Sequence, residues 1–219
     1  QRGCSFGCCY CTYPILEGRQ ARRRPAAEVA TELEQVEQQG ARHVFLVDSV
    51  FNSTTAHAVD ICEAVIRRKL ELRWGCVLRP QGLTPELMKL MARAGLSHIE
   101  FGSDSFCDTV LQSYQKGLTF DDILQSSELA RRESLDFCHF LICGGPGETL
   151  ATLEATFANS RRLTSAVIMA GGGMRIFPGT TFGGRGVCEG RLGADTSLLP
   201  PPDYPVAGLH GGGGLHRRT

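Results

Sequence analysis

Two patterns of apolar residues alternate along residues 25–162. Short apolar runs of strand length are each followed by a segment whose apolar residues recur every three or four positions, which is the spacing of an amphipathic helix. Helices are expected at 26–39 and 56–69, each with one apolar face. The expected strands are 43–48, 72–78, 97–102, 137–143 and 166–177. Strands that alternate with helices in this way predict an α/β fold built on a parallel sheet.

Capping residues mark where the later helices begin and end. Thr84 and Pro85 suit the first positions of a helix that stops at Gly95. Thr119 begins the next helix, and two aspartates in its first turn interact favourably with the positive end of the helix dipole. A further helix begins near Thr149. We expect it to bury three apolar side chains: Leu150, Leu153 and Phe157.

Polar residues at the ends of the expected strands are candidate ligand contacts. Successive βα units coil in a right-handed sense, so they close into a partial barrel or spread into a doubly wound sheet, and periodicity does not separate the two. In both arrangements ligands meet the carboxyl ends of the strands, where the loops converge. The candidates at these ends are Asp48, Ser49, Glu100 and Ser103.

A glycine-rich turn from Cys143 to Glu148 joins an expected strand to the helix that follows it. Glycines such as Gly145 let the backbone approach a ligand closely, and the N-terminus of a helix favours polar or anionic groups. A nucleotide P-loop is excluded because no Gly-Lys-Ser/Thr sequence follows. The alternative is an ordinary strand-to-helix turn without a ligand.

The charge balance gives no broad footprint for nucleic acid or a membrane surface, because 23 basic residues match 23 acidic ones. The basic run that ends at Arg24 is interpreted as a solvated loop. Lys116 could neutralise a carboxylate, but a solvated lysine is the favoured interpretation. No apolar stretch approaches the length of a membrane span, and no signal peptide is recognised. We therefore expect a cytoplasmic protein whose cysteines are reduced.

Three cysteines lie close together near the start of the chain. Cys4, Cys8 and Cys11 form a Cys-x3-Cys-x2-Cys array. A 4Fe-4S cluster normally takes four thiolates, so three leave one iron free to bind another molecule. A structural zinc site is the alternative, although it needs four ligands that usually come as two separated pairs.

This array, with aromatic Tyr10 directly before the third cysteine, resembles the signature of the radical S-adenosylmethionine (SAM) enzymes. The resemblance implies that the free iron binds SAM and that an electron from the cluster cleaves SAM to a deoxyadenosyl radical, which abstracts hydrogen from a substrate that the sequence does not reveal. It also implies a partial (βα)6 TIM-like barrel over residues 1–180. Because only three residues precede Cys4, we expect the first strand of that barrel to be largely missing from this sequence.

The resemblance also assigns roles to the polar candidates. Asp48, which ends its strand together with Ser49, matches the position that meets the SAM amino group; the alternative is a helix cap or loop carboxylate. Glu100 and Ser103 match the strand end near the ribose and methionine parts. Gly145 and Glu148 fit an element near adenine. Arg175, on an expected strand, is a candidate contact for a substrate or SAM carboxylate. The set expected to bind the cofactor is Tyr10, Asp48, Ser49, Glu100, Ser103, Gly145, Glu148 and Arg175.

Residues around the array resemble the branch of this superfamily that often carries a cobalamin-binding domain. This implies cobalamin-dependent methyl transfer through a domain outside this chain, and a reductant protein such as flavodoxin or ferredoxin. Residues 181–219 are rich in glycine and proline, so we expect a loosely ordered tail. An inactive fragment of a larger radical SAM protein is the other alternative.

Overall fold

The fold is built on a parallel sheet of five strands. The computed structural model describes residues 1–190 and 203–204. Each strand pairs in parallel with its neighbours, in the order β1-β2-β3-β4-β5, so all five carboxyl ends lie at one edge. The strands are β1 (His43–Leu46), β2 (Arg73–Leu78), β3 (Leu96–Asp104), β4 (Asp136–Cys143) and β5 (Val167–Gly172).

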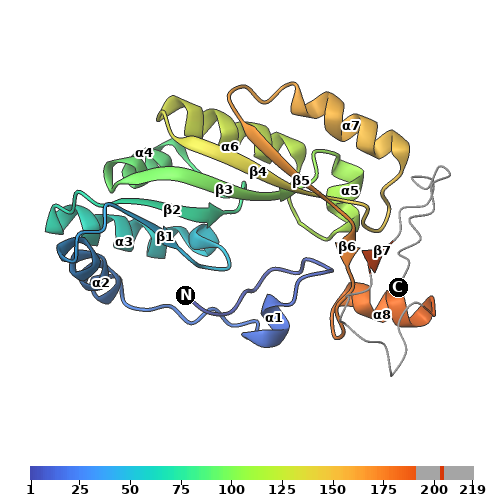
Figure 1. Ribbon diagram of the computed structural model, residues 1–219, viewed down its shortest axis with the longest axis horizontal. Helices are drawn as coiled ribbons and strands as arrows, with labels where there is room; N and C mark the ends of the chain where they lie inside the picture. The colour runs from blue at the N-terminus through green and yellow to red at the C-terminus, as the bar shows by residue number, and fades with distance from the viewer. Residues whose placement is uncertain (191–202, 205–219) are drawn as a thin grey trace, which may run out of the picture.

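Helices cover the convex face of this curved sheet, and the N-terminal segment lies across the other face (Figure 1). The helix before the first strand is α2 (Ala26–Gln38), and the helices between the strands are α3 (Thr55–Arg68), α4 (Pro85–Arg93), α5 (Asp108–Ser113), α6 (Phe120–Arg132) and α7 (Leu150–Ser160). The remaining elements are α1 (Tyr13–Leu16), the 3-10 turn η1 (Phe51–Ser53), β6 (Met174–Arg175), α8 (Thr181–Cys188) and β7 (Asp203–Tyr204). None of the described helices is both long and apolar enough to cross a bilayer.

The main core lies between the sheet and its helices, where apolar strand residues meet the apolar faces of α3 and α4. Trp74 on β2 is almost fully buried, and its ring nitrogen donates to the Ala94 carbonyl at 2.8 Å. Cys62 on α3 is fully buried in the same core, as its place on the apolar face predicts. Burial of these side chains is the main force that holds the layers together.

The expected caps are confirmed. The Thr84 hydroxyl accepts from the Leu87 N–H, and Thr119 forms a capping box with Asp122. Gly95 ends α4 with a φ of 98°. These signals are local, so the sequence alone was sufficient to place them.

The last expected strand is interrupted. Gly173 has a φ of 87° and donates its N–H to the Cys143 carbonyl at 2.7 Å. This turn ends β5 at Gly172, and the chain continues as the short strand β6, which pairs antiparallel with β7 in a second sheet. The prediction of one continuous strand over 166–177 is therefore wrong at its centre.

The predicted buried face of α7 is also wrong. Leu150 and Phe157 are 57% and 55% exposed. The helix is held instead by polar contacts: Thr156 is buried against the Ser105 hydroxyl at 3.1 Å, and Asn159 donates to the Phe106 carbonyl at 2.7 Å. A pattern of apolar residues shows which side of a helix could be buried, but the surrounding structure decides which side is.

The expectation of a loose tail is wrong for its first residues. Thr181–Cys188 forms α8, capped by the Thr180 hydroxyl, and Phe182 on this helix is buried. The rest of the predicted tail lies outside the described residues, apart from β7. At the other end, residues 1–3 contribute a single antiparallel bridge between Arg2 and Arg22.

The fully buried His139 gives the fold a predicted pH dependence. Its ring lies between the Ser103 and Ser127 hydroxyls, at 2.7 and 3.0 Å, and stacks on Phe101. Burial lowers the pKa of His139 to about 4, from 6.5 in an exposed chain. Between these values the unfolded chain binds the extra proton, so stability is complete above about pH 6.5 and declines towards about pH 4.

Replacing His139 by Gln should remove this decline, which amounts to at most about 3 kcal/mol. The amide keeps hydrogen-bonding capacity without titrating. Urea unfolding of both proteins at several pH values between about 4 and 7 measures the difference. If the two curves run parallel with pH, the assignment to His139 is wrong.

Candidate functional site

The three cysteines lie on an irregular loop, residues 4–11, at the carboxyl edge of the sheet. The loop is held by backbone hydrogen bonds to distant segments. Cys4 N–H donates to the Gly18 carbonyl at 3.1 Å and Cys9 N–H to the Tyr114 carbonyl at 3.0 Å, while the Cys9 carbonyl accepts from Phe182 N–H at 2.8 Å. The loop is therefore fixed at its start by its own return segment, and near its end by the end of α5 and by α8.

A small apolar cluster supports this loop from below. The Tyr10 ring meets the Tyr114 ring edge-on, with centroids 6.1 Å apart. Burial raises the pKa of the Cys9 thiol to about 11, with a further contribution from neighbouring Cys8. Cys9 therefore stays protonated near neutral pH and serves as a core residue. The buried members of the cluster are Cys9, Val110, Tyr114, Met174, Ile176 and Phe182.

The three signature thiols are free, and their chemistry suits an iron-sulfur cluster. Cys4 is buried, whereas Cys8 and Cys11 are half-buried. Burial raises the pKa of Cys11, and the neighbouring thiols of Cys8 and Cys4 raise it further. Because they would repel one another as thiolates, the loop needs positive charge nearby to hold them ionised.

The donor set of the loop fits a 4Fe-4S cluster better than a structural zinc ion. Zinc takes four protein ligands in a structural site, whereas a cluster can be held by three thiolates, each on a different iron. The loop offers the three signature thiols, while Cys9, the fourth cysteine of the loop, is buried in the apolar cluster.

A buried polar network ties the loop to the end of β3. Tyr10 donates a hydrogen bond to Asp104, and the Lys116 ammonium lies 2.8 Å from the same carboxylate oxygen. Burial, followed by the Asp104 charge, raises the pKa of Tyr10, which keeps the phenol protonated as a donor. Asp104 has a φ of 66°, a left-handed conformation that is rare for a residue other than glycine. The interpretation of Lys116 as a solvated lysine is wrong.

A second buried cation lies beside the network. Arg79 follows β2, and its guanidinium carbon lies 4.3 Å from the centre of the Phe6 ring, inside the cysteine loop. Its side chain donates to the Lys116 carbonyl. Asn52 fixes its backbone, because the Asn52 amide accepts from Arg79 N–H and donates to the Arg79 carbonyl, both at 2.9 Å. Sequence reasoning missed Arg79 and assigned no role to Asp104, although both stand at strand ends.

Asp48 and Ser49 lie where the sequence places them, at the end of β1 beside the start of the loop. Asp48 accepts from the backbone nitrogen of Gln1. The Ser49 hydroxyl donates to the Gly3 carbonyl at 3.1 Å, directly before Cys4. Both side chains therefore contact the segment that leads into the cysteine loop.

Glu100 and Ser103 point to opposite faces of β3. Glu100 is half-buried on the open face, in register with Val77 on β2 and Cys138 on β4. Ser103 is fully buried on the helix side, where it contacts His139. Only Glu100 thus shares a face with the loop.

Gly145 and Glu148 shape the turn after β4. Gly145 N–H donates to the Tyr114 hydroxyl at 3.0 Å, and a Cβ at this position would lie 2.4 Å from the same oxygen. The Glu148 carboxylate accepts from Gly144 N–H, and burial raises the pKa of Glu148. These residues therefore fix the turn against the residue that anchors Cys9. Arg175 is exposed on β6.

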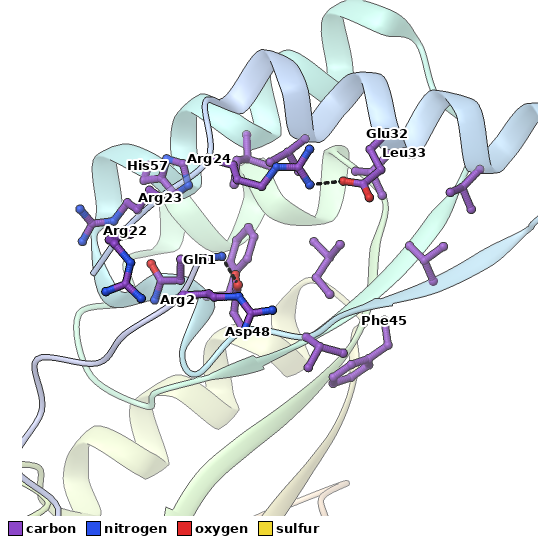
Figure 2. A pocket seen from close by; sticks show the side chains of 17 residues that line it. Gln1, Arg2, Arg22, Arg23, Arg24, Glu32, Leu33, Phe45, Asp48 and His57 are labelled. Atoms are coloured by element: carbon purple, nitrogen blue, oxygen red, sulfur yellow. Dashed lines mark hydrogen bonds and ion pairs between the residues drawn. The ribbon is translucent and has the colours of Figure 1, made fainter. Parts of the chain in front are cut away.

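A separate groove of about 670 Å³ opens beside the free edge of β1, next to the first residues of the chain. Figure 2 shows Arg24 turned towards Glu32 on α2, and Gln1 turned towards Asp48. Apolar residues of α2 and β1 form its floor, which explains why that face of α2 is only half-buried. They are Val29, Leu33, Val36, Val44, Phe45 and Leu46.

The parallel α/β sheet carries three free cysteines on one loop at its carboxyl edge, as the sequence predicts. Residues 1–158 match the model of the Radical SAM superfamily. The chain therefore belongs to the radical SAM superfamily, a family of enzymes, and its sheet is the expected partial barrel.

Individual relatives agree with this assignment. The tryptophan 2-C-methyltransferase of Streptomyces laurentii is 26% identical over 192 residues, covering 81% of this chain and 32% of that protein. A tRNA-2-methylthio-N(6)-dimethylallyladenosine synthase of Syntrophotalea carbinolica is 32% identical over 166 residues, covering 71% of this chain and 38% of that protein. This chain thus spans about a third of the length of the curated relatives it matches.

A solved structure has the same fold. The radical SAM methyltransferase TsrM from Kitasatospora setae, solved with cobalamin and a [4Fe-4S] cluster bound, superposes with a TM-score of 0.79 at 29% identity, covering 83% of this chain and 37% of that chain. The cobalamin-dependent enzyme OxsB superposes with a TM-score of 0.75 over 94% of this chain and 38% of that chain, at 16% identity. The second likeness concerns the fold alone.

Removing one member of the buried ion pair should destabilise the protein more than removing both. Asp104→Ala leaves the Lys116 ammonium buried without its partner, at a cost of about 3–5 kcal/mol. Asp104→Ala combined with Lys116→Met removes the stranded charge and should recover much of that loss. Urea unfolding of the cluster-free protein measures both. A double variant no more stable than the single one would contradict the pairing.

Gly145→Ala should also destabilise, by about 1–3 kcal/mol, because its Cβ collides with the Tyr114 ring. Gly102→Ala on β3 is the matched control, since a Cβ there meets nothing within 4 Å. The free energy of unfolding of the two variants is compared with that of the parent protein. Equal effects at both glycines would show that the close approach to Tyr114 is not what requires glycine.

Proposed function

We propose that this chain is a radical SAM catalytic core in which Cys4, Cys8 and Cys11 hold a 4Fe-4S cluster. The observation that carries the proposal is the presence of three free thiols on one loop, fixed over the strand ends, in a chain that matches the family. Three protein thiolates leave one iron available to SAM. When bound, the cluster and SAM supply a deoxyadenosyl radical that abstracts hydrogen from a substrate still to be identified.

The chain's own residues position these groups. Tyr10 and Asp104 fix the end of the ligand loop, and Lys116 places positive charge beside it. Glu100 on the open face and Asp48 at the end of β1 are proposed to contact SAM. Gly145 presents backbone rather than a side chain to the same edge. Ser103 is left out of this set because its hydroxyl is engaged by His139 on the other side of the sheet.

We further propose that the reaction is a cobalamin-dependent methyl transfer, with cobalamin bound outside this chain. The support is the similarity to the tryptophan methyltransferase and to TsrM, at 26% and 29% identity. A one-electron reductant protein of the flavodoxin or ferredoxin class would reduce the cluster. Release of deoxyadenosine or of S-adenosylhomocysteine distinguishes radical cleavage of SAM from transfer of its methyl group.

Replacing Cys4, Cys8 or Cys11 by Ala should abolish cluster assembly. Cys9→Ala is the matched control in the same loop and should keep the cluster, because that thiol packs in the apolar cluster. The measurements are iron and sulfide content and absorbance after anaerobic reconstitution, followed by product analysis with dithionite and SAM. Wild-type iron content in Cys8→Ala, or stoichiometric zinc in place of iron, would refute the proposal.

Cluster assembly and SAM cleavage are separate readouts. A chain that assembles the cluster but releases neither deoxyadenosine nor S-adenosylhomocysteine is a cluster-binding core that needs its partner domains for turnover. That result would retain the ligand assignment and reject catalysis by this chain alone.

A further inference from the structure

Arg79 is a buried cation without a carboxylate partner in the described part of the chain. The residue is 7% exposed. None of the ion pairs found within residues 1–190 includes it. Its side chain donates to neutral oxygens, the Lys116 carbonyl and the Gln81 amide at 3.4 Å. A buried charge that is not balanced by an opposite charge is costly.

The surroundings of Arg79 place this charge beside the cysteine loop. Its guanidinium lies over the ring of Phe6, which is two residues from Cys4 and two from Cys8. The other buried cation, Lys116, is already neutralised by Asp104 at 2.8 Å. These three residues, two cations and one carboxylate, therefore carry one net positive charge beside the loop.

We propose that the buried charge of Arg79 raises the reduction potential of the cluster held by this loop. The inference rests on the proposed function, since it requires the cluster. Reduction adds one electron from an external reductant of the flavodoxin or ferredoxin class, and with it one negative charge. A fixed positive charge in a site of low dielectric stabilises the reduced form more than the oxidised form. Arg79 is thus a positioning residue that acts through the cluster and its ligand loop.

The structure also explains why arginine suits this position. Its planar guanidinium can lie flat on the Phe6 ring and donate in its own plane to the Lys116 carbonyl, a combination that a lysine ammonium does not reproduce. The hydrogen bonds from Asn52 hold the backbone on either side. The guanidinium is therefore held in place before any ligand binds. It does not need to move when the cluster is reduced.

The test is a redox titration of the reconstituted protein, followed by electron paramagnetic resonance. Arg79→Gln should lower the equilibrium constant for cluster reduction on the order of tenfold, which corresponds to a midpoint potential about 59 mV more negative. Arg79→Lys keeps the charge and should stay near wild type. Arg73→Gln, at the other end of β2 and exposed, is the matched control and should not shift the potential.

Each outcome decides between the two proposals. If wild type assembles no cluster, the proposed function fails and this inference fails with it. If Arg79→Gln holds a full cluster that titrates like wild type, only this inference is overturned. A loss of SAM affinity in equilibrium dialysis without a shift in potential also overturns it, because the cation then meets the SAM carboxylate. Should Arg79→Gln not fold, Arg79→Met removes the charge while keeping the apolar stem, and the same shift is expected.

Discussion

The two backbone hydrogen bonds of Cys9 are the constraint on which the site depends. An irregular loop has no ladder of its own, so its shape has to come from the parts of the chain it touches. Through one residue, the ligand loop is joined to the end of α5 and to the start of α8. Tyr114 has two roles here: its carbonyl receives the loop, and its hydroxyl receives Gly145 from the turn after β4. Two segments distant in sequence, the ligand loop and the turn after β4, thus meet at one tyrosine.

Charge is arranged around this framework in an unusual way for a protein interior. Asp104, Lys116 and Arg79 are all almost fully buried within one neighbourhood. Asp104 also adopts a left-handed backbone conformation, which costs free energy in a residue with a side chain. Features of this kind concentrate where a protein needs a fixed arrangement of charge. The free-energy cost of burying these charges and of the strained Asp104 backbone indicates a preorganised site for an anionic group.

The fold could be predicted further from the sequence than the site could. Helix caps such as Thr84 and Thr119 depend on residues three or four positions away, so local patterns were sufficient. The spacing of the three cysteines is likewise a local pattern, and it alone was sufficient to indicate a cluster-binding loop. The surroundings of Lys116 are different, because its burial is created by Asp104 and by the loop from residues 4–11. No residue near Lys116 in the sequence indicates its ion pair with Asp104. The exposure of α7 was missed for the same reason, since the contacts of Thr156 and Asn159 come from the segment after β3.

The contact between Phe182 and the ligand loop shows that the part of the chain needed for the site differs from the part matched by the family model. The family model matches residues 1–158. The loop, however, is hydrogen-bonded to residue 182 and packed against Phe182 and Ile176. A chain that ended at residue 158 would retain every cysteine of the signature and lose part of the apolar cluster that supports the loop. The smallest unit that carries its own site is therefore longer than the segment that the family model matches.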